Sequence, residues 1–338
     1  MRLAMQIFIY KEEYFYDKIL SSSKALIEET IKDKDKFYRE KKIPKKNGDR
    51  TLFCLKKDCP LSKVQQNIRM NFLNKISIPD YVYGFVPNHS YKDFLLPHTN
   101  KKYYIRLDIK NFFDSINSEI LSEIFSYYFQ VKDVVNDVLL RQFIELVTLN
   151  DRVPQGAITS PIISNIIFRQ LDLRIRKYCA KFNITYTRYA DDLLFSSDNP
   201  YLHKDFFIKK IKYIVSTKGF QLNKGKVRYD KDFISLNGFV VEKNIRLSRK
   251  KLKNISNTLF ILERYKNKFN LNIVLAEINK MQLKKEISSI SELINYLAGY
   301  RSFLIQLLDK ENLENFENEK FLKYINRIQT AIIFLDSQ

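Results

Sequence analysis

The sequence is short of the residue types that build most metal and disulfide sites. It contains no tryptophan, three histidines and three cysteines in 338 residues. Cys54, Cys59 and Cys179 show none of the paired spacings that hold zinc, and an odd number of cysteines is typical of a reducing compartment. We therefore expect neither a disulfide framework nor a histidine-rich metal centre.

Long apolar runs and linkers are also missing. No stretch of about 18 apolar residues could form a spanning helix. Lys11, Glu12 and Glu13 interrupt the first apolar segment too early for a signal peptide. There is no internal repeat and no long Gly/Ser or Pro linker. These absences predict a cytoplasmic protein with no membrane partner.

Positive charge is what the sequence has in excess. Lysine and arginine outnumber acids by 58 to 38, which gives a net charge of +20, and hydrophobic residues make up 45% of a chain that can therefore bury a core. The excess is concentrated in residues 31–57, with eleven cations against four acids, and in 243–285, with twelve against two. Two basic flanks around a more acidic centre favour a nucleic-acid cleft, with Tyr and Phe rings available for stacking on bases.

Short strands surround the acidic centre. Residues 103–109 form a β-rich run with Asp108 near its end. Residues 185–189 and 193–196 predict a hairpin whose turn holds Asp191 and Asp192, and 233–236 with 239–241 predict another around Asn237-Gly238. Helical patterns lie near 117–147, near 161–182 and from about 248 onward. Strands and helices in this order indicate an α+β fold with helices on one face of a sheet.

Asp191 and Asp192 are adjacent carboxylates in an apolar hairpin. Such pairs are common in ordinary turns. Like charges this close repel each other, however, and burial increases the cost. A divalent cation removes both costs, because Mg²⁺ prefers carboxylate oxygens, and Asp108 would complete the ligand set. The prediction is a site for two Mg²⁺ ions roughly 3.5–4 Å apart, with Mn²⁺ as a substitute, that promotes phosphoryl transfer.

Three motifs resemble those of the reverse transcriptase family, in its order and spacing. Tyr189-Ala190-Asp191-Asp192 resembles the catalytic hairpin, the run from Arg106 to Ile116 resembles the first catalytic strand, and the run from Val153 to Pro161 resembles the loop around nucleotide and template. The resemblance spans roughly residues 40–245. It implies that the catalytic residues are Asp108, Asp191 and Asp192, and that the metal ligands are these three with Ile109.

The same resemblance implies a nucleotide-binding set. The stretch from Ile43 to Arg50 resembles the fingers motif that grips the triphosphate, although an exposed basic loop is the alternative. Phe113 occupies the place of the gate against a ribose 2′-hydroxyl, with a core phenylalanine as the alternative. Lys226, or else Lys224, matches the lysine that protonates pyrophosphate. The full set is Lys45, Arg50, Phe113, Gln155, Gly156 and Lys226.

Two further nucleic-acid contacts are implied beyond the catalytic motifs. Leu236, Asn237 and Gly238 resemble the turn that grips the primer 3′ end. A helix beginning near Ser248 would display basic residues at spacings of three and four, and the alternative is a merely solvated face. The residues expected to contact the nucleic-acid backbone are Arg246, Arg249, Lys250, Lys251 and Lys253.

The expected fold is a right-hand polymerase. It would consist of an N-terminal extension with fingers at 1–105, a ferredoxin-like palm with an antiparallel sheet at 106–242, and a helical basic thumb at 243–338. From the length we expect no RNase H domain, integrase, maturase extension or endonuclease after the thumb.

The most similar subgroup is the compact bacterial one, comprising retron and defence-associated enzymes related to group II introns. The implied function is RNA-directed DNA synthesis from dNTPs, in a retron-like or antiphage system with a specific noncoding RNA and an effector protein as partners. Two elements typical of retrons match only in part. Of Asn-Ala-x-x-His, only the histidine is present, as His98, and of Val-Thr-Gly, only the glycine is present, as Gly238. The sequence favours a non-retron defence enzyme at least as much as a typical retron enzyme. Alternatives are an RNA-dependent RNA polymerase, an untemplated or protein-primed DNA polymerase, or a catalytically silent RNA-binding scaffold.

Overall fold

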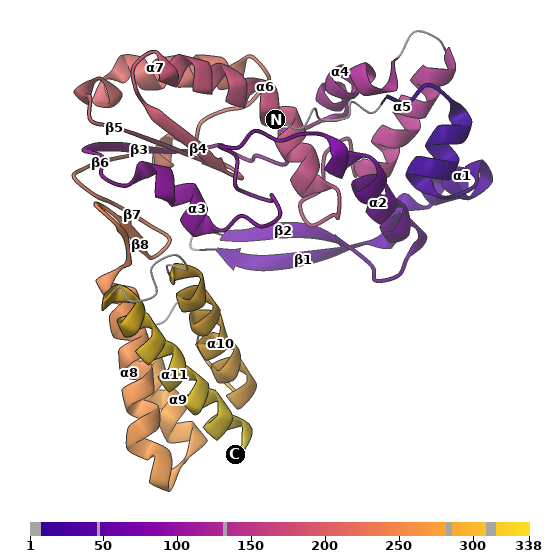
Figure 1. Cartoon of the computed structure of the whole chain (residues 1–338). Coiled ribbons are helices and arrows are strands. Elements are labelled where there is room, and N and C mark those ends of the chain that lie inside the picture. The colour runs from indigo at the N-terminus through magenta and orange to yellow at the C-terminus, as the bar shows by residue number, and fades with distance from the viewer. Residues whose placement is uncertain (1–7, 46–47, 131–133, 282–285, 309–315) are drawn as a thin grey trace. The chain divides into compact units, whose positions relative to one another are not determined.

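The computed structural model describes residues 8–45, 48–130, 134–281, 286–308 and 316–338, and the side chains of residues 44, 45, 48, 49, 316 and 317 lie outside that description. The chain forms two compact units (Figure 1). The first comprises Met1–Pro97 and Lys101–Lys231, and the second comprises His98–Asn100 and Asp232–Gln338. The borders predicted at 105/106 and 242/243 stay predictions.

A four-stranded antiparallel sheet is the centre of the first unit. Its strands lie in the order β4-β5-β3-β6. Helices connect β3 to β4, a tight turn connects β4 to β5, and one helix connects β5 to β6, which is the βαββαβ order of a ferredoxin-like palm. The strands are β3 (Tyr103–Asp108), β4 (Thr185–Tyr189), β5 (Asp192–Ser197) and β6 (Arg228–Lys231).

Two long helices cover one face of this sheet (Figure 1). They are α6 (Ser160–Ala180) and α7 (Asp205–Ser216). The Phe207 ring of α7 lies 5.1 Å from that of Phe195 on β5, and Tyr186 of β4 donates a hydrogen bond to Asp172 of α6. The predicted α+β fold with helices on one face is confirmed.

The remaining elements of the first unit precede the sheet or connect its strands. A hairpin of β1 and β2 runs in full register from Tyr38 opposite Leu55 to Lys45 opposite Gly48. The other elements are the π-helix Tyr14–Leu20, the 3₁₀ turns Lys34–Phe37, Leu73–Lys75, Leu96–His98, Pro200–His203 and Lys224–Lys226, and α1 (Lys24–Lys32), β1 (Tyr38–Lys45), β2 (Gly48–Leu55), α2 (Pro60–Asn71), α3 (Tyr91–Leu95), α4 (Ser118–Phe129) and α5 (Val134–Val147).

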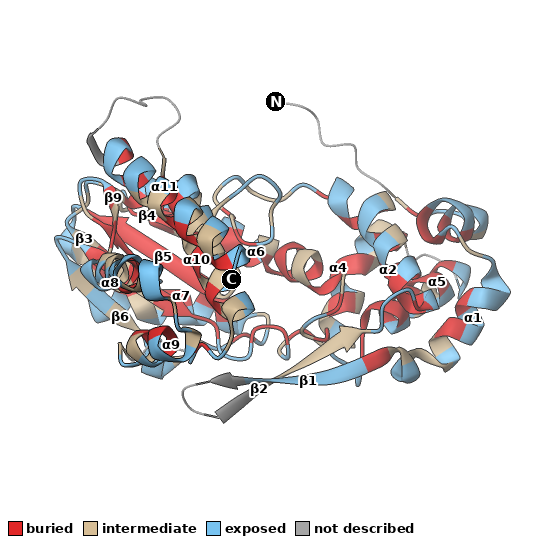
Figure 2. Ribbon diagram, turned by 90° about the horizontal axis from the view of Figure 1, so that it is seen from below, coloured by how far each residue is buried: buried red, intermediate tan, exposed pale blue. Residues whose placement is uncertain are grey.

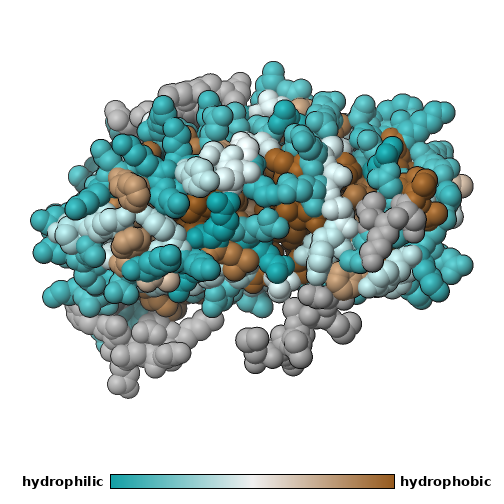
Figure 3. All heavy atoms as spheres, turned by 90° about the horizontal axis from the view of Figure 1, so that it is seen from above, coloured by the Kyte–Doolittle hydropathy of each residue, from teal (hydrophilic) through white to brown (hydrophobic). Residues whose placement is uncertain are grey.

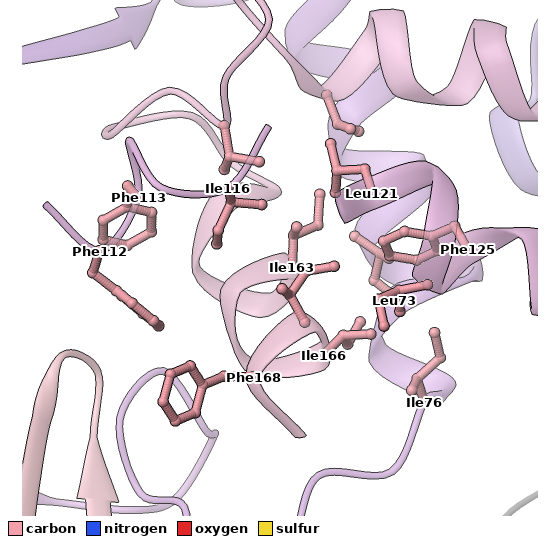
Figure 4. Packing of buried hydrophobic residues seen from close by; sticks show 14 of the residues in the cluster. Leu73, Ile76, Phe112, Phe113, Ile116, Leu121, Phe125, Ile163, Ile166 and Phe168 are labelled. Atoms are coloured by element: carbon pink, nitrogen blue, oxygen red, sulfur yellow. The ribbon is translucent and has the colours of Figure 1, made fainter. Parts of the chain in front are cut away.

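Aromatic rings fill the core of this unit. Phe72 contacts the rings of Phe125, Phe129 and Phe143 at 5.8–6.0 Å in edge or tilted geometry, which is favourable for π-systems. Figure 4 shows the core around Phe125, and Figure 2 shows β4 and β5 mostly in red, as buried strands. The rigid core holds the strand ends that carry the acidic residues.

The second unit pairs a small sheet with four helices. Asn237 and Gly238 both have positive φ, 48° and 90°, as a two-residue hairpin turn of this kind requires. Ser248 caps α8 by accepting a hydrogen bond from the Lys251 amide, so the helix begins where the sequence predicted. The elements are β7 (Ile234–Leu236), β8 (Phe239–Val241), β9 (Ile245–Leu247), α8 (Arg249–Tyr265), the 3₁₀ turn Lys266–Lys268, α9 (Leu271–Asn279), α10 (Ile290–Leu307) and α11 (Phe316–Asp336).

None of the helices in the described part of the chain combines the length and the hydropathy needed to cross a membrane. The face shown in Figure 3 is mostly hydrophilic, with hydrophobic side chains scattered among polar ones.

Candidate active site

The three predicted catalytic acids meet at the ends of two neighbouring strands. Asp108 lies directly opposite Asp192 in the β3–β5 ladder. The amide of Ile109 donates to the Asp191 carbonyl at 2.9 Å, which continues the pairing by one residue. Tyr189 pairs with Asp192, so Ala190 and Asp191 form a two-residue turn, with Ala190 at φ 55°. The sheet therefore brings together acids that are more than 80 residues apart in sequence.

Two of these carboxylates are held by cations. Arg106 donates three hydrogen bonds of 2.7–2.9 Å to Asp192, in a bidentate arrangement. Lys226 donates to Asp108 at 2.7 Å. Among the described residues, no cation is close enough to form an ion pair with Asp191. Burial, followed by the negative charge of Asp108, raises the pKa of Asp191. Burial also raises the pKa of Asp192, against the opposing effect of Arg106.

This donor set fits a hard divalent cation. Asp108 and Asp191 supply carboxylate oxygens at one point, and their mutual repulsion is the kind that a metal relieves. A preformed cage of three carboxylates is absent, however: across the described ranges, no three Asp, Glu, His or Cys side chains are grouped to hold one ion. Asp192 instead accepts three hydrogen bonds from Arg106, which occupy part of its capacity as a metal ligand.

A cavity of about 640 Å³ opens beside these acids. Its size and polarity suit a nucleotide. Seven of the residues predicted for catalysis, metal or nucleotide binding line it: Arg50, Asp108, Ile109, Phe113, Gln155, Asp191 and Lys226. Asp192 and Gly156 do not line it. Lys45 lies on β1, but its side chain is outside the described part of the chain.

The β1–β2 hairpin forms one wall of the cavity. Arg50 donates to the Gln155 side chain at 2.5 Å, and the Phe53 amide donates to the Gln155 carbonyl at 2.8 Å. The hairpin is therefore fastened to the loop before α6. The sequence had left an exposed basic loop as the alternative for Arg50, but the residue lies half-buried on a strand and faces the cavity.

Gly156 is explained by packing rather than by contact with the cavity. Its φ is +115°, and a Cβ there would lie 3.1 Å from the Phe53 carbonyl oxygen and 3.2 Å from Cys54 Sγ. Both contacts are tighter than side chains normally make, so glycine is needed where the loop passes β2. The expected approach of Gly156 to a nucleotide stays a prediction.

Phe113 belongs both to the core and to the cavity. Its side chain is 9% exposed and packs against the rings of Phe112 and Phe85, at 5.6 Å and 6.1 Å. Figure 4 shows it beside Phe112 and Ile116. Because Phe113 also lines the cavity, the two readings made from sequence, a gate and a core residue, are compatible.

Several residues of the site were not assigned a role from the sequence, although Asn111, Phe112 and Asp114 lie inside a recognised motif. Arg106 was part of a recognised motif, but its ion pair with Asp192 follows only from the register of β3 and β5. The unpredicted residues of the cavity wall are Glu40, Thr51, Phe53, Asn111, Phe112, Asp114 and Asn223.

A comparison with known families identifies the family of this chain. The family described as reverse transcriptase (RNA-dependent DNA polymerase) matches residues 43–256. The chain belongs to this family. That range holds every predicted catalytic and nucleotide-binding residue, and most of the first unit.

Curated relatives narrow the resemblance. The chain is 30% identical over 200 residues to the retron Mx65 reverse transcriptase of Myxococcus xanthus, covering 55% of this chain and 46% of the relative. It is 35% identical over 166 residues to the retron Ec73 reverse transcriptase of Escherichia coli, covering 46% and 51%. The chain thus spans about half the length of these relatives. The resemblance to bacterial reverse transcriptases of the retron group is confirmed.

Behind the hairpin turn that holds Asp191 and Asp192 lies a buried ion pair that the sequence did not reveal. Arg188 and Asp172 are both 0% exposed and are joined by three hydrogen bonds of 2.8–3.1 Å. Arg188 also donates to the Ala190 carbonyl at 3.1 Å and to the Asn165 side chain at 3.0 Å, and Asn165 donates to the Gly84 carbonyl at 2.8 Å. The hairpin turn is thus fixed from inside the palm.

Gly84 presses directly on that turn. A Cβ at this position would lie 2.3 Å from the Ala190 amide nitrogen and 2.9 Å from the Tyr189 carbonyl carbon, both backbone atoms. We expect Gly84→Ala to lower the free energy of unfolding by about 1–3 kcal/mol, as overpacking does, and to slow nucleotide incorporation by displacing Asp191.

Urea denaturation and a primer-extension rate test the Gly84 prediction. Gly299→Ala is the matched control, since nothing lies within 4 Å of its added Cβ and it sits inside α10, where alanine is favoured. A Gly84→Ala protein as stable and active as the Gly299→Ala protein would contradict the close packing.

In the second unit, the residues predicted as a primer grip form the β7–β8 turn. Leu236 is buried, and Asn237 and Gly238 line a cavity of about 990 Å³ with residues of α8 and α10. A Cβ on Gly238 would lie 2.2 Å from Lys251 Cε. The Lys251 ammonium lies 3.6 Å from the centroid of the Phe303 ring, a cation–π contact.

The basic residues around the start of α8 differ in their surroundings. Arg246 is paired with Glu242 at 3.0 Å, and Lys251 is packed against Gly238 and Phe303. Arg249, Lys250 and Lys253 are exposed. The predicted backbone contacts therefore rest most directly on these three.

Proposed function

We propose that the chain is an RNA-directed DNA polymerase that adds dNTPs to a primer. The observation that carries the proposal is the cavity in which Asp108 and Asp191 face Arg50, Gln155 and Lys226. Carboxylates and cations that line one cavity suit a metal-bound triphosphate, and membership of the reverse transcriptase family supports the reaction.

The residues of the cavity divide the work of phosphoryl transfer. Asp108, Asp191 and the Ile109 carbonyl would hold divalent metal, Mg²⁺ or Mn²⁺, which supplies charge to activate a 3′-hydroxyl and to stabilise the leaving pyrophosphate. Arg50, fixed by Gln155, presents a planar fork to phosphate oxygens. Lys226, which donates a hydrogen bond to Asp108, would donate a proton to the leaving pyrophosphate.

The names of the relatives support a retron-like role. The relatives are retron reverse transcriptases, which favours a specific structured noncoding RNA as template and partner. At residues 94–98 and 236–238 the sequence differs from the elements typical of retrons, so a non-retron antiphage enzyme is a second candidate. An effector protein and the primer grip at Leu236, Asn237 and Gly238 stay proposals on the resemblance alone.

Extension assays separate this proposal from its alternatives. RNA-templated synthesis should depend on template sequence and use dNTPs. Labelling without template would indicate an untemplated or protein-primed polymerase. Preference for ribonucleotides would indicate an RNA polymerase. RNA binding without any synthesis would indicate a silent scaffold.

Phe113 is proposed as the gate that excludes ribonucleotides. Because the ring lines the cavity and would act by bulk, Phe113→Ala should reduce the preference for dNTPs over rNTPs by roughly tenfold or more, the range typical of removing a steric barrier. Single-nucleotide incorporation with matched dNTP and rNTP measures the ratio. Phe85→Ala, which removes a neighbouring ring outside the cavity wall, is the control. An unchanged ratio in Phe113→Ala would leave Phe113 as a core residue only.

Arg249, Lys250 and Lys253 are proposed to contact the nucleic-acid backbone. Replacing all three with Gln should weaken RNA binding and make the dependence of log affinity on log salt shallower by about one unit for each phosphate that is no longer neutralised. Arg246→Gln should change the slope less, because its guanidinium is paired with Glu242. A triple variant with the wild-type slope would mean that these three residues are only solvated and do not contact nucleic acid.

A further inference from the structure

The outer face of α6 and α7 lies on the side of these helices away from the sheet. Tyr178 of α6 stacks with Phe207 of α7, and Arg174 of α6 donates to Thr217 at the end of α7 at 2.6 Å, so the two helices run antiparallel side by side. The α6–α7 face is defined by outward-facing residues at spacings of three, four and seven: Gln170, Leu173, Arg174, Lys177, Phe206, Lys209, Lys210 and Tyr213.

Two exposed aromatic rings lie on this face. Phe206 is 61% exposed and Tyr213 is 58% exposed, although α7 buries the apolar stripe Phe207, Ile211, Ile214 and Val215 against the sheet. The two rings are seven residues apart, about 10 Å along the helix. Single exposed rings are common on protein surfaces, but two rings on one helix face with cations beside them form a candidate contact surface.

Cations lie between and beside these rings. Lys209 is exposed, and Lys210 lies 5.1 Å from the Tyr213 ring centroid. Arg174 and Lys177 extend the charge onto α6. The acids of the two helices are Asp205, at the first residue of α7, and Asp172, which is buried against Arg188. The face is therefore cationic, with two rings available for stacking.

We propose that the α6–α7 face binds a single strand of nucleic acid, with bases stacked on Phe206 and Tyr213 and phosphates beside the lysines. This combination of rings and cations is how single strands are bound without sequence preference. Lysine is depleted at protein–protein interfaces. An interfacial membrane helix needs a free apolar stripe, but that of α7 is already buried. The inference adds a second contact region to the proposed polymerase, outside the wall of the nucleotide cavity.

Fluorescence anisotropy with a labelled oligouridylate RNA tests the proposal, and a matching oligothymidylate DNA shows which sugar is preferred. Phe206→Ala/Tyr213→Ala should weaken binding about tenfold or more, since each stacked base contributes substantially. Lys209→Gln/Lys210→Gln should lower the salt slope by about 1.4, from two single-strand contacts. Tyr127→Ala, which removes a ring 53% exposed on α4, should change neither.

Ultraviolet crosslinking locates the contact directly, and the oligonucleotide should attach to the peptide that contains α7. Unchanged affinity in both double variants, with folding verified by thermal melting, would overturn the proposal. Binding to vesicles of anionic phospholipid but not to the oligonucleotides would also overturn it. So would double variants that bind the oligonucleotides normally but no longer capture a protein. Asp191→Asn should bind normally at this face, so failure of the polymerase proposal and failure of this inference are distinguishable.

Discussion

Asp191→Asn is expected to reduce nucleotide incorporation by at least about a thousandfold. Asp191 lines the nucleotide cavity, and among the described residues no cation is near enough to pair with it, so its charge is available to a divalent metal. Losing one ligand of a metal that stabilises the transition state costs several kcal/mol, and each 1.36 kcal/mol corresponds to a tenfold change in rate. Rapid single-turnover extension measures the effect.

The control for Asp191→Asn is Asp198→Asn, which removes an exposed carboxylate paired with Lys101 and should leave the rate unchanged. Removing the negative charge of Asp191 should not lower stability, because that charge is buried beside Asp108. A folded Asp191→Asn protein that extends a primer at the wild-type rate would remove Asp191 from the catalytic site.

Arg188→Met is expected to lower the free energy of unfolding by about 3–5 kcal/mol, the typical cost of leaving one buried charge without its partner. Asp172 is fully buried, and without Arg188 it would retain only the hydrogen bond from Tyr186. Burial already raises the pKa of Asp172 against the effect of Arg188, so loss of the cation should make the carboxyl take up a proton. Urea denaturation gives the change.

The double variant Arg188→Met/Asp172→Leu separates the ion pair from its position in the core. Replacing both charges removes the unpaired group, so it should recover much of the lost stability. Nucleotide incorporation should be slow in both the single and the double variant, because both lack the hydrogen bond from Arg188 to the Ala190 carbonyl. Equal losses of stability in the single and double variants would mean that packing, not charge, dominates at this site.

The sequence predicted three of the four strands of the sheet, β3, β4 and β5, because their signals are local, but it did not predict β6. The β-rich run at 103–109 and the hairpin around Asp191 and Asp192 have alternation and turn residues that need no distant partner, and both are present. Asn237-Gly238 predicted its turn for the same reason. The β1–β2 hairpin was not predicted as strands, because its residues are basic and polar and it is fastened through Gln155, over 100 residues away.

In the site, too, local motifs were predictable from the sequence, whereas contacts between distant segments were not. Motif order identified Asp108, Asp191, Gln155 and Lys226, and the structure places all four at one cavity. The pairing of Arg106 with Asp192 depends on strand register. The contact of Gly84 with Ala190 depends on a loop that crosses the hairpin. The spacing of residues in the sequence predicts neither this contact nor the Arg106–Asp192 pair.

Templated incorporation is the most direct test of the central proposal. The protein is given an RNA template annealed to a DNA primer, Mg²⁺ and each of the four dNTPs singly, and elongation by one nucleotide is scored. We predict addition only of the dNTP complementary to the next template base, abolished in Asp108→Asn and Asp191→Asn. Addition independent of the template base, or addition that survives both substitutions, would contradict the account.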